Sequence, residues 1–325
     1  MNRRALLAAS PAAIAAATTA RPAFAQSDFP TGPVRGIVPF AAGSATDSVA
    51  RLFGERMRET LGQPVVVENR AGANGMIGAE AVARAAPDGQ TIMFGTNSTN
   101  AAANALNRRV PFNMERDFAP VSLLSSVPLL VAVPANSRFR TLEDLLTAAR
   151  ARPEAVSFAT SSASQRVSTE MLASMAGVKM LPVPYRSSPN AVQDLIAGRV
   201  DLFVADMAVI LPGVQGGQLR ALGVTTKARA PQLPDILPIA QQGLPDYEIF
   251  AWFVLCAPAA TPPRIIARLN EAVRRAAADP TLKDRIENGL GMSLTVGSPE
   301  EAAAFIRTET VKWTDAIRAA GIEPE

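Results

Sequence analysis

Apolar residues in the first third of the chain follow first strand and then helix periodicity. Val34–Phe40 predicts a buried strand, and Val65–Val67 and Thr91–Phe94 predict two more. The segment between the first two strands carries apolar residues at helical spacing: Val49, Leu52, Phe53, Met57 and Leu61. A second helix should run to about Ala86, and residues 95–100 read as a polar loop. This β-α-β-α-β order predicts a parallel sheet with helices on both faces.

A second series of the same kind begins at Leu129–Val133. Four further strands are predicted, with helices between them: Val156–Ala159, Leu181–Val183, Val200–Val204 and Leu219–Val224. A serine-rich loop, Thr160–Gln165, should precede a helix near Val167–Met175. After a strand at Phe250–Leu255, three helices start where first-turn prolines belong, at Pro262, Pro280 and Pro299.

The two series predict an α/β fold with two lobes, each a mostly parallel sheet flanked by helices. We place lobe 1 at residues 26–128 and 246–325 and lobe 2 at residues 129–245, with crossings near Val127–Val133 and Thr225–Phe250. Loops at the carboxyl ends of the strands then form the walls of a cleft, the usual ligand site of open α/β sheets.

The first 25 residues have the order of an export signal. Arg3 and Arg4 precede an uncharged alanine-rich run, and the A-x-A sequence ending at Ala25 is a cleavage site. The run is too short to span a bilayer comfortably. We therefore predict a signal peptide cleaved after Ala25 and a periplasmic protein. The arginine pair resembles a twin-arginine signal, and Sec export stays open as the alternative.

Removing this segment changes the charge of the protein. The whole chain carries a formal charge of +3, but residues 1–25 contain three arginines and no acid. The remaining 29 basic residues balance 29 acidic ones, so the basic character belongs to the leader. No long basic run remains, and a nucleic acid or an anionic membrane surface is not expected as a partner. Nothing in the sequence requires more than a monomer.

The residue types limit the chemistry. The chain has no histidine, which excludes Ser–His triads and histidine-ligated metals. Its single cysteine, Cys256, lies in an apolar run and reads as a buried structural thiol. No G-x-x-x-x-G-K-[ST] phosphate loop occurs, and we expect neither a cofactor nor a metal. An enzyme using Asp47 or Asp206 as acid or base is the less favoured alternative to a binding protein.

The loop from Phe40 to Asp47 is the best candidate site in lobe 1. Its small residues let backbone N–H groups approach a ligand, and it opens a helix N-terminus that favours an anion such as a carboxylate. Ser44 adds a hydroxyl, and Asp47 either holds a ligand amine or caps the helix. Taken alone, the loop fits an ordinary capped strand–helix connection better than a ligand site.

Polar residues follow other predicted strands as well. Thr96 and Asn97 come after the third strand, and Ser161, Ser162 and Ser164 lie between a strand and a helix of lobe 2. Serine is common in loops, so each group is weak evidence by itself. Asp206 follows a lobe 2 strand, where facing the cleft and capping a helix are equally good interpretations.

A series of short motifs resembles one known family. The string Pro39–Asp47 is similar to the P-F-x-x-G-G-x-x-D loop of Bug-type substrate receptors of tripartite tricarboxylate transport systems. Further matches occur in the family's order over nearly the whole chain beyond the leader: Val67–Arg70, Pro87–Gly89, Arg116–Phe118, Val183–Arg186, Gly198–Asp201 and Leu219–Leu222.

The resemblance implies a Venus-flytrap periplasmic-binding-protein fold that captures a small carboxylate: a dicarboxylate, an acidic amino acid or an aromatic acid. It implies delivery to the membrane subunits of a transporter, with a receptor that feeds a membrane sensor as the alternative. On the family's pattern, lobe 1 contributes one jaw: Phe40, Ala42, Gly43, Ser44, Asp47, Thr96 and Asn97. Lobe 2 contributes the other: Ser161, Ser162, Ser164, Tyr185 and Asp206.

Three positions depart from that pattern. Ser44 replaces the second glycine of the first loop, and the lobe 2 serine loop lacks the S-S-G-x-G-T form. Ala205-Asp206 stands where many relatives have D-N. The departures lie on the surfaces that touch a ligand, so they bear on which ligand is bound and not on the fold.

Overall fold

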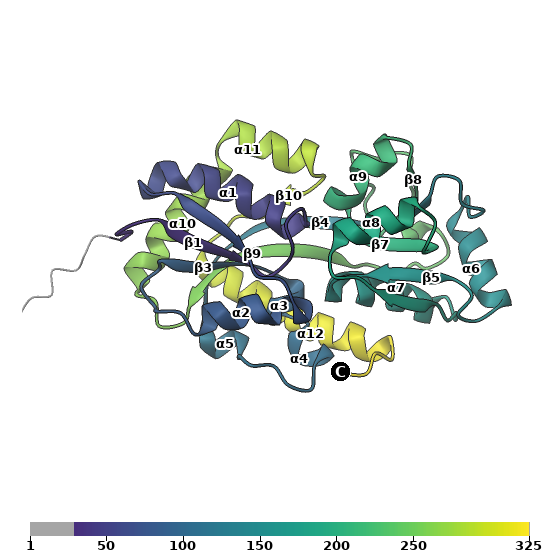
Figure 1. The fold of residues 1–325 in the computed structure, drawn as a ribbon, viewed down its shortest axis with the longest axis horizontal. Coiled ribbons are helices and arrows are strands. Elements are labelled where there is room, and N and C mark those ends of the chain that lie inside the picture. Colours follow the sequence, from purple (N-terminus) through teal and green to yellow (C-terminus); the bar gives the residue numbers. More distant parts are fainter. Residues whose placement is uncertain (1–28, 325) are drawn as a thin grey trace, which may run out of the picture.

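The computed structural model describes residues 29–324, and Figure 1 shows two lobes connected by the long strand β4. The predicted signal peptide, residues 1–25, lies outside the described residues. The first lobe contains β1 (Val34–Val38), α1 (Ala45–Leu61), β2 (Val65–Asn69), α2 (Met76–Ala83), β3 (Thr91–Thr96), α3 (Asn97–Asn100), α4 (Ala103–Leu106), α5 (Met114–Asp117), β9 (Phe250–Pro258), α10 (Pro263–Ala277), α11 (Pro280–Asp284), β10 (Ser293–Leu294) and α12 (Pro299–Ala319). The second contains α6 (Leu142–Ala151), β5 (Ser157–Thr160), α7 (Ala163–Met175), β6 (Leu181–Pro184), α8 (Ser188–Ile196), β7 (Leu202–Asp206), α9 (Met207–Gln215) and β8 (Leu219–Val224).

Each lobe is built on a mixed sheet in which three adjacent strands on the outer side are parallel. In the first lobe the order is β2-β1-β3-β9-β4, with β1 parallel to both β2 and β3 and β9 antiparallel to its neighbours. In the second lobe β5 is parallel to β6 and β7, and β4 is antiparallel to β7 and β8. Helices cover both faces of each sheet (Figure 1). The carboxyl ends of the parallel strands are therefore where loops from both lobes can meet.

Strand β4 (Phe118–Pro134) belongs to both sheets. It pairs with β9 from Phe118 to Pro128, and from Leu129 onward it pairs with β7 and β8 instead. Thr225, directly after β8, ties this junction: its Oγ1 accepts from the Leu129 N–H at 2.8 Å, and its own N–H donates to the Leu129 carbonyl at 3.0 Å. The change of partner strand thus takes place within one continuous strand, between residues 128 and 129.

Local sequence explains why α1 starts and stops where it does. Ser44 is its N-cap, with Oγ accepting from the Asp47 N–H at 3.3 Å, and Gly62 ends it in the left-handed conformation at φ 73°. The apolar positions predicted from helical spacing are all buried, and Phe53 and Met57 are fully so. This apolar side packs α1 against the sheet and α10.

Buried polar groups fix β9 to its neighbours in the first lobe. Glu309 on α12 is only 3% exposed and accepts from the indole N–H groups of Trp252 at 3.0 Å and Trp313 at 3.2 Å. Cys256 on β9 is fully buried, as predicted, and burial raises the pKa of its thiol to about 12. Both features are structural: a thiol with that pKa stays protonated and unreactive.

Two predicted segments were wrong, and the first half of one strand was not predicted. Residues 97–100 form the one-turn helix α3 instead of a loop, because the Thr96 N–H is satisfied by Thr99 Oγ1 at 3.2 Å. The serine-rich loop is shorter than predicted, since α7 already begins at Ala163. The sequence reading also missed the first half of β4, where three serines and Pro120 interrupt the apolar pattern that a buried strand shows.

Candidate functional site

A small cavity lies where the loops at the strand ends of the two lobes meet. Its walls come from both lobes: Phe40, Ser44, Ala45, Thr46, Thr96, Ser98 and Phe253 from the first, and Ser162, Ser164, Gln165, Ser188 and Asp206 from the second. Its volume is about 20 Å³, room for roughly one water molecule. The polar residues that line it are all at least nine-tenths buried. The two lobes are thus closed on one another around a polar interior.

Six of the twelve residues predicted for the site line this cavity: Phe40, Ser44, Thr96, Ser162, Ser164 and Asp206. The other six lie next to it or outside it: Ala42, Gly43, Asp47, Asn97, Ser161 and Tyr185. Tyr185 points elsewhere, since its hydroxyl donates to Asp194 at 3.0 Å. Ala42 is exposed on the loop before α1. The remaining four have structural positions that the following contacts define.

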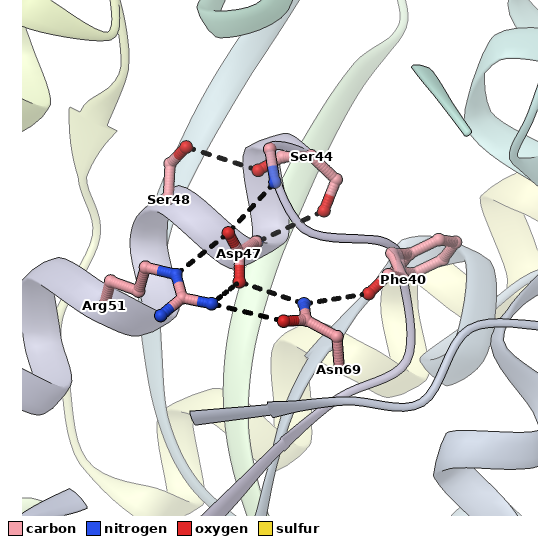
Figure 2. Close-up of polar contacts among 7 residues, drawn as sticks. Phe40, Ser44, Asp47, Ser48, Arg51 and Asn69 are labelled. Atoms are coloured by element: carbon pink, nitrogen blue, oxygen red, sulfur yellow. Dashed lines mark hydrogen bonds and ion pairs between the residues drawn. The ribbon is translucent and has the colours of Figure 1, made fainter. Parts of the chain in front are cut away.

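Asp47 holds the first-lobe loop in shape (Figure 2). Its carboxylate accepts from the Gly43 N–H at 3.0 Å, from Arg51 Nε at 3.0 Å and from Asn69 Nδ2 at 2.9 Å. Asn69 Nδ2 also donates to the Phe40 carbonyl at 3.0 Å, so the carboxylate connects both ends of the loop to β2. All its acceptor positions face the protein, and this arrangement leaves Asp47 as a support for the loop.

The same contacts determine the charge state of Asp47. Burial by itself raises the pKa of a carboxyl group, but here the hydrogen bonds from Arg51, Gly43 and Asn69 outweigh it. The pKa of Asp47 therefore lies below its ordinary value of 3.8. Asp47 is ionised at neutral pH, and its charge is already compensated by Arg51, 3.0 Å away.

Gly43 in this loop lies close to the second lobe. Its φ of +79° favours glycine, and a Cβ added there would lie 3.3 Å from Cγ of Pro189 on α8. A second contact across the cavity runs from the Ser164 N–H on α7 to Ser98 Oγ on α3, at 3.4 Å. Both contacts join residues of different lobes, so both depend on the lobes being closed.

The second wall is organised by a glutamine. Gln165 in the first turn of α7 accepts from the Ser161 N–H at 2.8 Å, and its Nε2 donates to Ser188 Oγ at 2.9 Å. Ser162 and Ser164 hydroxyls lie 3.0 Å apart beside it. Gln165 thus joins the start of α7 to the start of α8. Ser188 and Phe253 were not among the predicted residues, and nothing in their local sequence marks them.

Among residues 29–324, four helices begin at the cavity and no cation lines it. The N-caps or first residues of α1, α7, α8 and α9 are Ser44, Ser162, Ser188 and Asp206, each among the lining residues. Free N–H groups and the helix dipole make such termini attractive to anions. On the first-lobe side, Asn97 is fully buried beside Thr96, and within residues 29–324 its Nδ2 has no hydrogen-bond partner. An anion in this cavity would therefore meet helix dipoles and hydroxyl groups in place of a full positive charge.

Larger hollows lie elsewhere on the molecule. One of about 440 Å³ lies among α3, α4, α5 and α12 of the first lobe. Another of about 510 Å³ lies beside the β4 junction, around Pro128 and Arg229. Neither lies at the meeting strand ends. Over the part of the chain that the structure describes, no group of three or more His, Cys, Asp or Glu side chains is placed to hold a metal ion.

Comparison with known proteins shows the family to which the chain belongs. The profile of the family described as "Tripartite tricarboxylate transporter family receptor" matches residues 49–322. A protein encoded between tcbD and tcbE in Pseudomonas sp. strain P51 is 40% identical over 98% of this chain and 94% of its own length. BugT of Bordetella pertussis is 32% identical over 99% of both chains. The chain belongs to the tripartite tricarboxylate transporter receptor family.

Solved structures of similar proteins have the same fold. R. palustris Rpa4515, determined with adipate, superposes with a TM-score of 0.89 at 33% identity and covers 92% of this chain and 100% of its own. MatC of Rhodopseudomonas palustris, with bound malate, gives 0.85 at 32% identity over 89% of this chain and 100% of its own. The structure titled as the periplasmic binding protein BugD gives 0.87 at 30% identity, over 91% and 100%. The predicted two-lobed binding-protein fold and the Bug-type resemblance are confirmed.

Membership of this receptor family also decides the class of function. Its members are substrate-binding proteins, so the chain is a solute-binding receptor, as predicted, and not an enzyme. Among residues 29–324, no helix combines the length and apolar character needed to cross a membrane.

Proposed function

We propose that this receptor captures a small carboxylate between its lobes and delivers it to the membrane subunits of a tripartite tricarboxylate transporter. The observation that carries the proposal is the closed cavity at which α1, α7 and α8 begin, which buried hydroxyls line and which no cation within residues 29–324 lines. Two similar receptors of known structure hold adipate and malate, which supports a carboxylate as the ligand.

The N-termini of α1 and α7 supply the attraction for the carboxylate. A helix N-terminus carries about half a unit of positive charge and leaves N–H groups free to donate. Ser44, Ser162 and Ser164 add hydroxyl donors at the same place, each at most 9% exposed. In a site shielded from water these dipoles act at a low effective dielectric, so they replace the arginine that many carboxylate sites use.

Binding requires the lobes to separate. A cavity of about 20 Å³ cannot contain even a small dicarboxylate, so the ligand must enter an open form and the lobes must close on it. We place the hinge at residues 128–129 of β4 and at Thr225, and the lobes at residues 26–128 with 246–325 and at residues 129–245. Ligand contacts made only in the closed form then shift the population toward closure.

The site of action follows from the proposed export signal. We propose that residues 1–25 direct the chain to the periplasm, that cleavage occurs after Ala25, and that the receptor acts as a monomer. The description of the family as a transporter receptor supports delivery to membrane subunits. Amino-terminal sequencing of the exported protein tests the cleavage site, and replacement of Arg3 and Arg4 by lysine tests twin-arginine export against Sec export.

Titration calorimetry with C4–C6 dicarboxylates, hydroxy acids and amino acids, combined with small-angle scattering, tests the binding function. We expect at least one acid to bind and to reduce the radius of gyration. Ser164→Asp places a negative charge at the start of α7 and should abolish binding. Ser174→Asp is the matched control, because it adds the same charge at an exposed position of the same helix. Absence of binding by every acid, or binding without compaction, would refute the clamp.

A further inference from the structure

Asp206 is the one charged residue among those that line the cavity. It ends β7 and occupies the N-cap position of α9, yet its side chain makes no capping hydrogen bond. It is 8% exposed, and within residues 29–324 no other side chain donates a hydrogen bond to its carboxylate. Of the two interpretations that the sequence leaves open, the geometry favours a carboxylate that faces the ligand.

In the part of the chain that the structure describes, no cation compensates this carboxylate. The strands β4 and β9 and the helix α9 contain no charged residue, and β7 contains only Asp206. The helices α1, α7 and α8 contain charged residues, but none of these lines the cavity: Asp47, Arg51, Glu55, Arg56, Arg58, Glu59, Arg166, Glu170 and Asp194. A buried carboxylate without a cation is costly, and burial raises the pKa of Asp206 to about 6.

We propose that the ligand itself supplies the missing cation. On the carboxylate-binding function proposed above, the ligand is a small amino acid whose carboxylate lies at the N-termini of α1 and α7 and whose protonated amine binds Asp206. The receptor then takes a zwitterion in preference to a dicarboxylate. Asp206 is the residue that determines this specificity.

The alternatives to an amine fit the site less well. A second carboxylate facing Asp206 would put two like charges together, and one of them would have to take up a proton before binding. A hydroxyl group donates a hydrogen bond but leaves the buried charge uncompensated. An ammonium group satisfies both needs, and hydrogen bonds between two charged groups are among the strongest in proteins.

The test compares pairs of acids of equal chain length that differ only at one end. Calorimetry at pH 7.5 would use succinate against 3-aminopropanoate, glutarate against 4-aminobutanoate, and adipate against 5-aminopentanoate, so that both acids of a pair have the same number of methylene groups between their ends. In at least one pair we expect the amino acid to bind about 10-fold to 100-fold more tightly. Asp206→Asn and Asp206→Ser should remove that preference. Asp235→Asn is the control, since it removes the same charge at an exposed site outside the cavity.

The pH dependence of ligand affinity is a second test, and the proposal predicts its direction. Binding of an ammonium group needs ionised Asp206, so affinity for the amino acid should fall as the pH drops below about 6. Affinity for a dicarboxylate should rise over the same range, because Asp206 becomes neutral. Two results overturn the proposal: dicarboxylates binding more tightly in every pair, or a preference that both Asp206 variants retain. Either leaves carboxylate capture intact, whereas failure of all acids to bind removes the proposed function itself.

Discussion

Asp47→Asn separates a supporting role for this residue from direct contact with the ligand. The substitution keeps the size of the side chain and removes its charge. Asparagine offers one acceptor oxygen and one NH₂ group, where the carboxylate accepts hydrogen bonds from Gly43, Arg51 and Asn69. At least one donor would then face another donor. The loop from Phe40 to Ser44 should lose part of its attachment to β2.

The expected cost can be worked from these contacts. A hydrogen bond to a charged group contributes about 1.5–3 kcal/mol, and a buried donor left unpaired costs about 1–3 kcal/mol. Asp47 is only 4% exposed, so solvent does little to replace the lost bonds. Asp47→Asn should therefore lower the free energy of unfolding by about 2–4 kcal/mol, measured by urea denaturation at pH 7.

The effect should depend on pH with a definite sign. The pKa of Asp47 is depressed in the folded protein, so its stabilising contribution is complete above the unfolded pKa and is lost as the pH falls through the folded one. The difference in stability between the wild type and Asp47→Asn should be constant between about pH 5 and 8. It should shrink below about pH 4.

Glu59→Gln on the same helix is the matched control. Glu59 forms an exposed pair with Arg56 at 3.4 Å, and such pairs contribute about 0–1 kcal/mol. A destabilisation by Asp47→Asn no larger than that of Glu59→Gln would refute the supporting role. Loss of ligand affinity at unchanged stability would show that Asp47 contacts the ligand directly, contrary to its geometry.

Substitutions at three other positions test the remaining structural assignments. Asp206→Asn should stabilise the ligand-free protein by about 2–3 kcal/mol at pH 7.5. Because burial raises the pKa of Asp206 to about 6, the folded wild type loses stability as the pH climbs from the unfolded pKa to 6. Urea denaturation should show that the gain vanishes below about pH 4. Gly43→Ala should weaken ligand binding more than it lowers stability. The strain at φ +79° is present in the open and the closed form, but the contact with Pro189 arises only on closure. An unchanged affinity in calorimetry would contradict this. Glu309→Ala should cost about 2–4 kcal/mol of stability and Glu309→Gln clearly less, because only alanine leaves both indole N–H groups without an acceptor.

The helices and strands could be predicted where the deciding interactions are local. The buried face of α1 is visible in residues three and four apart, and its ends are marked by Ser44 and Gly62. The same reasoning failed where tertiary contacts override local pattern. Strand β4 contains polar residues because two different sheets, rather than a regular apolar face, hold it in place along its length.

The candidate site could likewise be predicted only in part from the sequence. Hydroxyl-rich loops at strand ends could be found from the sequence, and three of them do meet at one cavity. Which side chains face that cavity could be found only in part. Asp47 is directed away from it by Asn69 on a neighbouring strand, while Ser188 and Phe253 are brought to it from segments with no sequence signal. Capping alone cannot tell whether Asp206 faces α9 or the ligand.

The sequence by itself therefore determined the two α/β series, the limits on chemistry and the family, because composition, periodicity and motif order are properties of the chain. Only the tertiary structure decided that four helix N-termini share one enclosed volume with a single uncompensated carboxylate. The physical reason is that a helix dipole and a buried charge act through space, even between residues as far apart in the sequence as Ser44 and Asp206, whereas sequence patterns report on neighbours along the chain.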